Sequence, residues 1–119
     1  MRTLPFLLLL VACCDAAQDT SEVMDNCSTD LTYQNFGESF LITWCRGCHS
    51  ATVPEDMRQM APPAVNYNSL ADAKRWRSGT IARVSNDGPV ARSMPPSGGP
   101  SDGERALFVE WMKCAKEMK

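Results

Sequence analysis

The sequence of 119 residues predicts one small domain that is mainly helical. Apolar residues recur at intervals of three and four in two segments, over residues 31–48 and again after Ser101, which is the spacing of one face of a helix. No segment shows the sustained alternation of apolar and polar residues that is typical of half-buried strands. The length is sufficient for one domain and too short for two.

The first predicted helix covers residues 31–48. Its apolar or small face consists of Tyr33, Phe36, Gly37, Phe40, Leu41 and Trp44. Glycine inside a helix costs about 1 kcal/mol relative to alanine, so we expect another helix to approach closely at Gly37.

The last predicted helix begins after the breaker at 98–100, where Ser101 and Glu104 have the spacing of a capping box. Its apolar stripe consists of Leu107, Phe108, Trp111 and Met112. The two terminal helices should pack against each other through Gly37, Leu41, Leu107 and Trp111.

Prolines interrupt the middle of the chain. Pro54, Pro62 and Pro63 exclude long helices after the first one and predict a loop. Ser69 is then the expected N-cap of a helix over residues 70–77, and a short helix over 80–85 follows.

The N-terminus has the pattern of a secretion signal over residues 1–12. An apolar run at 4–12 follows Arg2, and it is much shorter than the ~20 residues that span a bilayer. Residues 10–13 resemble the lipobox of bacterial lipoproteins. We therefore expect lipidation of Cys13 and membrane attachment on the periplasmic side; the alternative is a simply cleaved signal and a soluble periplasmic product.

Charge is unevenly distributed. The chain has 12 basic and 14 acidic residues, and four of the acids lie in segment 13–26, which has no basic residue. This segment is interpreted as a solvated tether. The remaining domain, 27–119, is close to neutral, which gives no support for nucleic-acid binding.

The most informative motif is Cys45-Arg46-Gly47-Cys48-His49, the attachment signature of c-type haem. The two thiols would form thioethers with the porphyrin, and His49 would be the proximal iron ligand, with its other ring nitrogen donating to an acceptor. A zinc site needs four ligands, and the chain has no second histidine. A redox-active thiol pair would need a βαβ context, which is not predicted.

Because the chain has one histidine, the sixth iron position is methionine, lysine or open. Met94 stands out, since Pro95 and Pro96 extend and stiffen its loop, and a thioether suits low-spin iron. Met57 and Met60 follow His49 closely and are assigned to the proximal loop.

These motifs, with Gly37 and Leu41 before the first cysteine and Ser93-Met94-Pro95-Pro96-Ser97-Gly98 after it, resemble a small monohaem cytochrome c of class I. The resemblance covers residues 31–112. It implies an all-α cytochrome c fold of three to four short helices around one covalent haem c, with His49 and Met94 as axial ligands. It also implies that a proline carbonyl, Pro62 or Pro63, accepts from His49.

The function implied is that of an extracytoplasmic one-electron carrier without enzyme activity, whose redox partners the sequence does not identify. Two alternatives are a haem sensor of small ligands and a fixed haem subunit of a membrane oxidoreductase. One cluster is expected to bind the haem propionates or an acidic partner, or else to be a solvated helix face: Asn66, Tyr67, Asn68, Lys74, Arg75, Trp76, Arg77 and Arg83.

Cys27 and Cys114 are extra to the general family pattern. With Cys13 lipidated and the motif thiols consumed, they are expected to form a disulfide in an oxidising compartment, where Cys14 on the tether is the poorer partner. The alternative is a pair of buried free cysteines.

Overall fold

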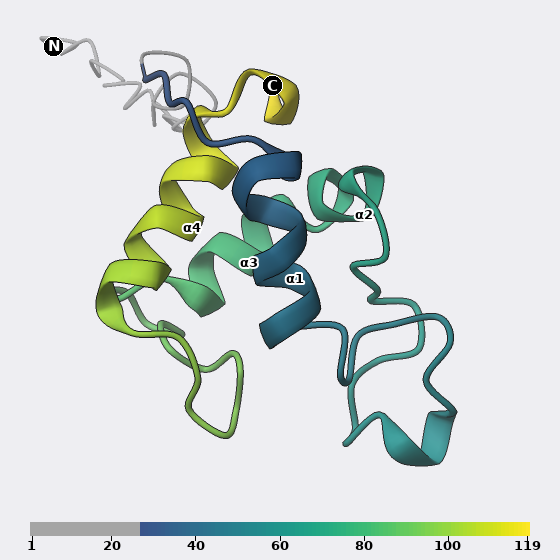
Figure 1. The fold of residues 1–119 in the computed structure, drawn as a ribbon. Helices are drawn as coiled ribbons and strands as arrows, with labels where there is room; N and C mark the ends of the chain where they lie inside the picture. Colours follow the sequence, from purple (N-terminus) through teal and green to yellow (C-terminus); the bar gives the residue numbers. More distant parts are fainter. Residues whose placement is uncertain (1–26) are drawn as a thin grey trace, which may run out of the picture.

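The computed structural model describes residues 27–119, which form helices and loops and contain no strand (Figure 1). The helical prediction is therefore confirmed for this part of the chain. The predicted signal segment 1–12, Cys13 and the tether 13–26 lie outside the described residues. Within 27–119, no helix has the length and apolar character needed to cross a membrane.

The N-terminal helix begins at Thr32, whose side chain forms a capping box with Asn35. A π-helical segment, η2 (Tyr33–Gly37), continues into α1 (Glu38–Trp44). The predicted end at residue 48 is wrong. At Cys45 the backbone has φ −115° and leaves the helix, and residues 45–49 form tight turns closed by a 2.9 Å hydrogen bond from the His49 amide to the Cys45 carbonyl.

The close approach predicted at Gly37 is confirmed. A Cβ atom added to Gly37 would lie 2.6 Å from Cε2 of Trp111, which is fully buried on α4 (Asp102–Cys114). The predicted role of Leu107 is wrong, because this side chain is 43% exposed. Phe108 takes its place and stacks on Phe40 with 4.1 Å between ring centroids, since α4 turns the face of Phe108 and Trp111 toward the first helix.

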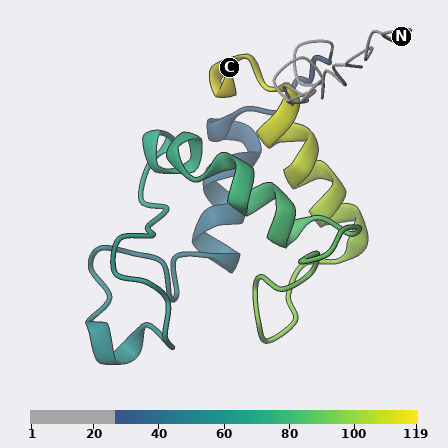
Figure 2. The ribbon, with the colours of Figure 1, turned by 180° about the vertical axis from the view of Figure 1, so that it is seen from behind.

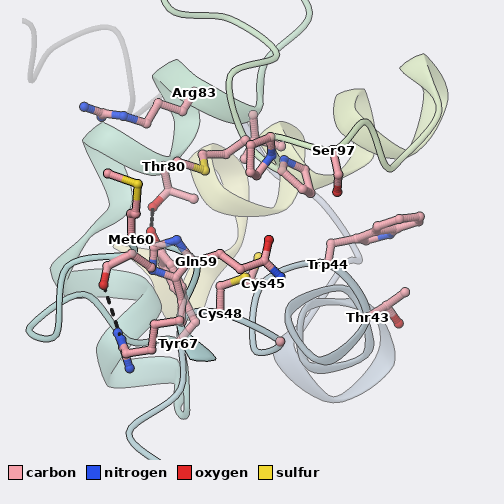
Figure 3. A pocket seen from close by; sticks show the side chains of 18 of the residues that line it. Thr43, Trp44, Cys45, Cys48, Gln59, Met60, Tyr67, Thr80, Arg83 and Ser97 are labelled. Carbon is pink, nitrogen blue, oxygen red and sulfur yellow. Dashed lines mark hydrogen bonds between the residues drawn. The ribbon is translucent and has the colours of Figure 1, made fainter. Parts of the chain in front are cut away.

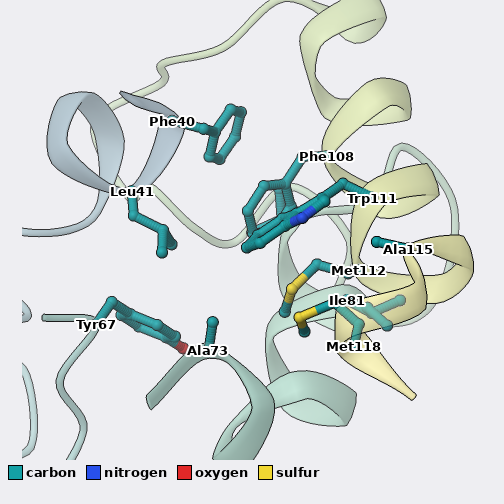
Figure 4. Close-up of a cluster of buried hydrophobic side chains, with 11 residues drawn as sticks. Phe40, Leu41, Tyr67, Ala73, Ile81, Phe108, Trp111, Met112, Ala115 and Met118 are labelled. Atoms are coloured by element: carbon teal, nitrogen blue, oxygen red, sulfur yellow. The ribbon is translucent and has the colours of Figure 1, made fainter. Parts of the chain in front are cut away.

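The helix α4 starts as the sequence predicts. Ser101 caps it, and Glu104 completes the capping box. Its buried face joins α1 and the segments after Tyr67 in one hydrophobic core (Figure 4). The core consists of Phe40, Leu41, Tyr67, Ala73, Ile81, Val84, Phe108, Trp111, Met112, Ala115 and Met118.

Two short helices between the long loops contribute Ala73, Ile81 and Val84 to this core. Ser69 caps α2 (Leu70–Arg75), as predicted, by accepting from the Asp72 amide. The helix ends two residues early because Trp76, with φ −100° and ψ 9°, breaks it. The next helix, α3 (Arg77–Val84), is longer than the predicted segment 80–85 and packs on α4.

Two long loops extend beyond the helices. The loop over 45–69 contains only the short helix η3 (Glu55–Met57), as the prolines predict. It and the loop over 85–101 lie on opposite sides of the C-terminal end of α1 in both views (Figures 1 and 2). The helices therefore hold the two loops on opposite sides of this end of α1 (Figures 1 and 2).

The two ends of the domain meet near η4 (Lys116–Met118). The Sγ atoms of Cys27 and Cys114 lie 2.05 Å apart and their Cα atoms 5.0 Å apart, as the expected disulfide requires. The bridge would close a loop over almost the whole described chain.

Candidate haem site

A cavity of about 350 Å³ opens between the two loops and α1 (Figure 3). Its volume lies within the range typical of pockets for small molecules and cofactors. Its walls include all four residues predicted to bind the haem: Cys45, Cys48, His49 and Met94. The fold thus brings the motif at 45–49 to the same cavity as a methionine from the other loop.

His49 is oriented by a backbone acceptor, but not by the one expected. Its Nδ1 lies 2.9 Å from the Val65 carbonyl oxygen, and because a carbonyl can only accept, Nδ1 carries the proton. The assignment of Pro62 or Pro63 is wrong. The Pro62 carbonyl accepts instead from the Val65 amide and from Arg58, and the loop continues to Val65 before it passes the imidazole.

The His49 ring is further confined by Tyr67, whose ring meets it edge-on with 5.5 Å between centroids. Within residues 27–119, the ring forms its hydrogen bond through Nδ1 alone. The remaining nitrogen, Nε2, is the atom with a lone pair available for a metal.

Neither motif thiol is in a disulfide. Burial raises the pKa of the Cys45 thiol to about 12, although the neighbouring Arg46 opposes the shift. The group is therefore neutral near pH 7. In the described part of the chain, no three His, Cys, Asp or Glu side chains gather as a metal site.

Met94 is half-buried, and its side chain packs against the core. Its backbone is held on both sides: its amide donates to the Arg83 carbonyl at 3.3 Å, and its carbonyl accepts from Arg105 at 2.9 Å. Met60 also lines the cavity but is 99% exposed, and Met57 is exposed on η3. Met94 is therefore the cavity methionine with a defined position.

Polar groups at the wall are paired. The hydroxyl of Thr80 donates to the Trp76 carbonyl at 2.8 Å, so the Tyr67 hydroxyl donates to Thr80 at 2.6 Å (Figure 3). Burial is the main cause of a raised pKa for Tyr67; the bond to Thr80 opposes the shift, Cys45 adds to it, and Arg83 opposes it. Tyr67 is thus a neutral phenol at the cavity wall.

The cluster expected to face propionates or a partner is mostly engaged elsewhere. Arg77 donates to the carbonyls of Met112 and Lys113, and Lys74 donates to that of Lys119. Asn66 accepts from Arg58 and donates to the Pro63 carbonyl. Asn68 accepts from the Ala51 amide and donates to the Ser50 hydroxyl. Arg75 lies over the Trp76 ring. Of the basic residues named, Arg83 alone lines the cavity, and it is exposed.

The sequence does not predict the residues that hold His49, Tyr67 and Met94 in place: Arg58, Val65, Thr80 and Arg105. No sequence signal separates the two arginines from the other basic residues. Thr80 lies four residues after Trp76, and this spacing is the one at which a threonine hydroxyl can donate to a carbonyl of the preceding helical turn.

Comparison of the chain with known protein families, with curated proteins and with solved structures finds no match.

Proposed function

We propose that this protein is an extracytoplasmic one-electron carrier of the class I cytochrome c type. Cys45 and Cys48 would hold one haem c as thioethers, and His49 and Met94 would be its axial ligands. When bound, the haem supplies a one-electron ferrous–ferric couple. The supporting observation is that one cavity is lined by two thiols, an imidazole and a thioether from distant segments.

The residues present fit this group. The thiols are unpaired, and the cavity wall contributes the apolar side chains of Phe40, Trp44 and Val84. Such walls would suit the faces of a porphyrin, and they would limit the access of water to a bound haem, whose burial is one means by which a protein tunes its potential.

His49 would bind iron through Nε2. The hydrogen bond from Nδ1 to the Val65 carbonyl selects the tautomer, and the edge contact with Tyr67 limits rotation of the ring. A histidine ligand is typically oriented in this way by its other nitrogen.

Met94 would supply a soft sixth ligand, which favours ferrous iron and raises the reduction potential. Its anchored backbone and the following Pro95 and Pro96, which also line the cavity, support retention of this ligand in both redox states. Retained ligation distinguishes a carrier from a sensor, in which the distal position must open.

Export and membrane attachment are part of the proposal and depend on the signal pattern at 1–12 and on Cys13. Purification from membranes, followed by identification of stable partners, distinguishes a lipid-anchored carrier that acts alone from a subunit of a larger oxidoreductase.

The test is expression of the full chain in a host that attaches haem c, followed by extraction with acid and organic solvent. Haem should remain with the parent protein and with a Cys27→Ser control. Cys45→Ser and Cys48→Ser should each retain one thioether or none. Complete extraction of haem from the parent would refute the proposal, and carbon monoxide binding by its ferrous form would favour the sensor instead.

A further inference from the structure

Two arginines are buried in the described part of the chain without a carboxylate partner. Arg58 and Arg105 are each 3% exposed. The ion pair found within residues 27–119 is Arg92–Asp102, which involves neither of them. Burying a charge is costly unless the charge is paired or fully hydrogen-bonded. In both arginines, carbonyl oxygens take the place of a carboxylate, so the positive charge is not neutralised.

Arg58 lies behind the proximal ligand and also lines the cavity. It donates to the carbonyls of Ser50, Pro62, Val65 and Ala61 and to the side chain of Asn66, at 2.6–3.3 Å. One acceptor matters most: the Val65 oxygen, 3.1 Å from Arg58 Nη2, is the same atom that accepts from His49 Nδ1. Arg58 therefore holds the acceptor that orients the imidazole.

Arg105 lies behind the distal loop. It donates to the carbonyls of Val84, Met94, Pro100 and Gly98, at 2.9–3.4 Å. These carbonyls lie along the whole loop between α3 and α4, and that of Met94 is 2.9 Å from Arg105 Nη1. One buried side chain thus ties the ends of the loop to the backbone of the methionine.

We propose that Arg58 and Arg105 are a pair of positioning residues, one behind each axial ligand, whose unpaired charges also favour ferrous iron. The proposal rests on the proposed function. Ferric iron carries one more positive charge than ferrous iron, and this charge is repelled by a buried cation more strongly than in water. Sharing of the Val65 oxygen with Arg58 also weakens the bond from His49, which makes the imidazole a poorer donor to ferric iron.

The experiment uses the full-length holoprotein with Arg58→Met, Arg105→Met and a control, Arg77→Met. Arg77 also donates to two backbone carbonyls, at 2.7 and 3.0 Å, but at the end of α4 and away from the cavity. Redox titration measures the ferrous-to-ferric ratio at a fixed applied potential. We expect this ratio to fall about tenfold in each of the first two variants, equivalent to ~59 mV for one electron, and to stay unchanged in the control.

Positioning is measured separately from charge with Arg58→Lys and Arg105→Lys, which keep the charge but lose the planar fork of donors. The reduction potentials of these variants should stay close to that of the parent protein. Arg105→Lys should nevertheless weaken the near-infrared band of sulfur ligation and admit carbon monoxide to ferrous iron. Because lysine preserves the buried cation, these variants also provide the measurement if the methionine variants do not fold.

Two results would overturn the inference. One is that the potentials of the Arg58 and Arg105 variants move no further than that of Arg77→Met; the other is that the lysine and methionine variants have equal potentials and unaltered ligand bands. A parent protein without covalent haem would refute the proposed function, and this inference with it. A haem-loaded parent with unmoved variants refutes the inference alone.

Discussion

Replacement of Gly37 by alanine should destabilise the domain, because the new methyl group would overlap the indole of Trp111. Its Cβ would lie 2.6 Å from two ring carbons and closer still to a third. Trp111 is fully buried, and its N–H donates to Glu117 at 3.0 Å, so displacement of the ring would disturb both its packing and this hydrogen bond. Overpacking of this kind costs ~3 kcal/mol at the upper end of its usual range.

Alanine also gains about 1 kcal/mol of helix propensity over glycine, so the expected net loss is about 2 kcal/mol. In a domain of this size, that loss lowers the melting temperature by about 8–16 °C. Thermal and urea unfolding of the holoprotein measure it. The control is Gly103→Ala in the first turn of α4, where a Cβ meets only Ser101 Oγ at 4.0 Å. Equal stability of Gly37→Ala and the control would refute the packing of α1 on Trp111.

Three further predictions follow from the site and its frame. Met94→Ala should give high-spin or water-ligated iron and a lower potential in optical spectra and redox titration, whereas Met60→Ala should resemble the parent; an unchanged Met94 variant would exclude this residue from the iron. Replacing Cys27 and Cys114 together by serine should cost about 4.5 kcal/mol in the chain-entropy model, given a sequence separation of 87 residues. Free alkylation of both thiols in the folded oxidised protein, detected by mass spectrometry, would show that the bridge is absent. Because the pKa of Tyr67 is raised in the fold, the unfolded chain loses this proton first, so stability should decline as pH rises above the ordinary tyrosine pKa of 10.0. Tyr67→Phe should remove that part of the decline in pH-dependent unfolding, and an identical pH profile would contradict the shift.

Features that depend only on neighbouring residues follow from the sequence alone. The capping box of Ser101 and Glu104, the N-cap at Ser69 and the prolines of the long loop each act over a few residues, and the structure shows all of them where the pattern predicts. The close contact at Gly37 is also predictable, because a glycine in the middle of an apolar helix face indicates that another helix approaches there. The proposed haem motif is likewise local, because Cys45, Cys48 and His49 lie within five consecutive residues.

Contacts between distant groups depend on how the whole chain packs. The choice of Val65 over Pro62 and Pro63 depends on the path of the loop past the imidazole, which adjacent residues do not specify. Whether Leu107 or Phe108 faces the first helix depends on the rotation of α4 about its axis, and this rotation is set by packing against the whole core. The hydrogen bonds of Arg105 likewise depend on the carbonyls that the loop over 85–101 brings around it, because a buried cation needs acceptors that are close in space and not only in sequence.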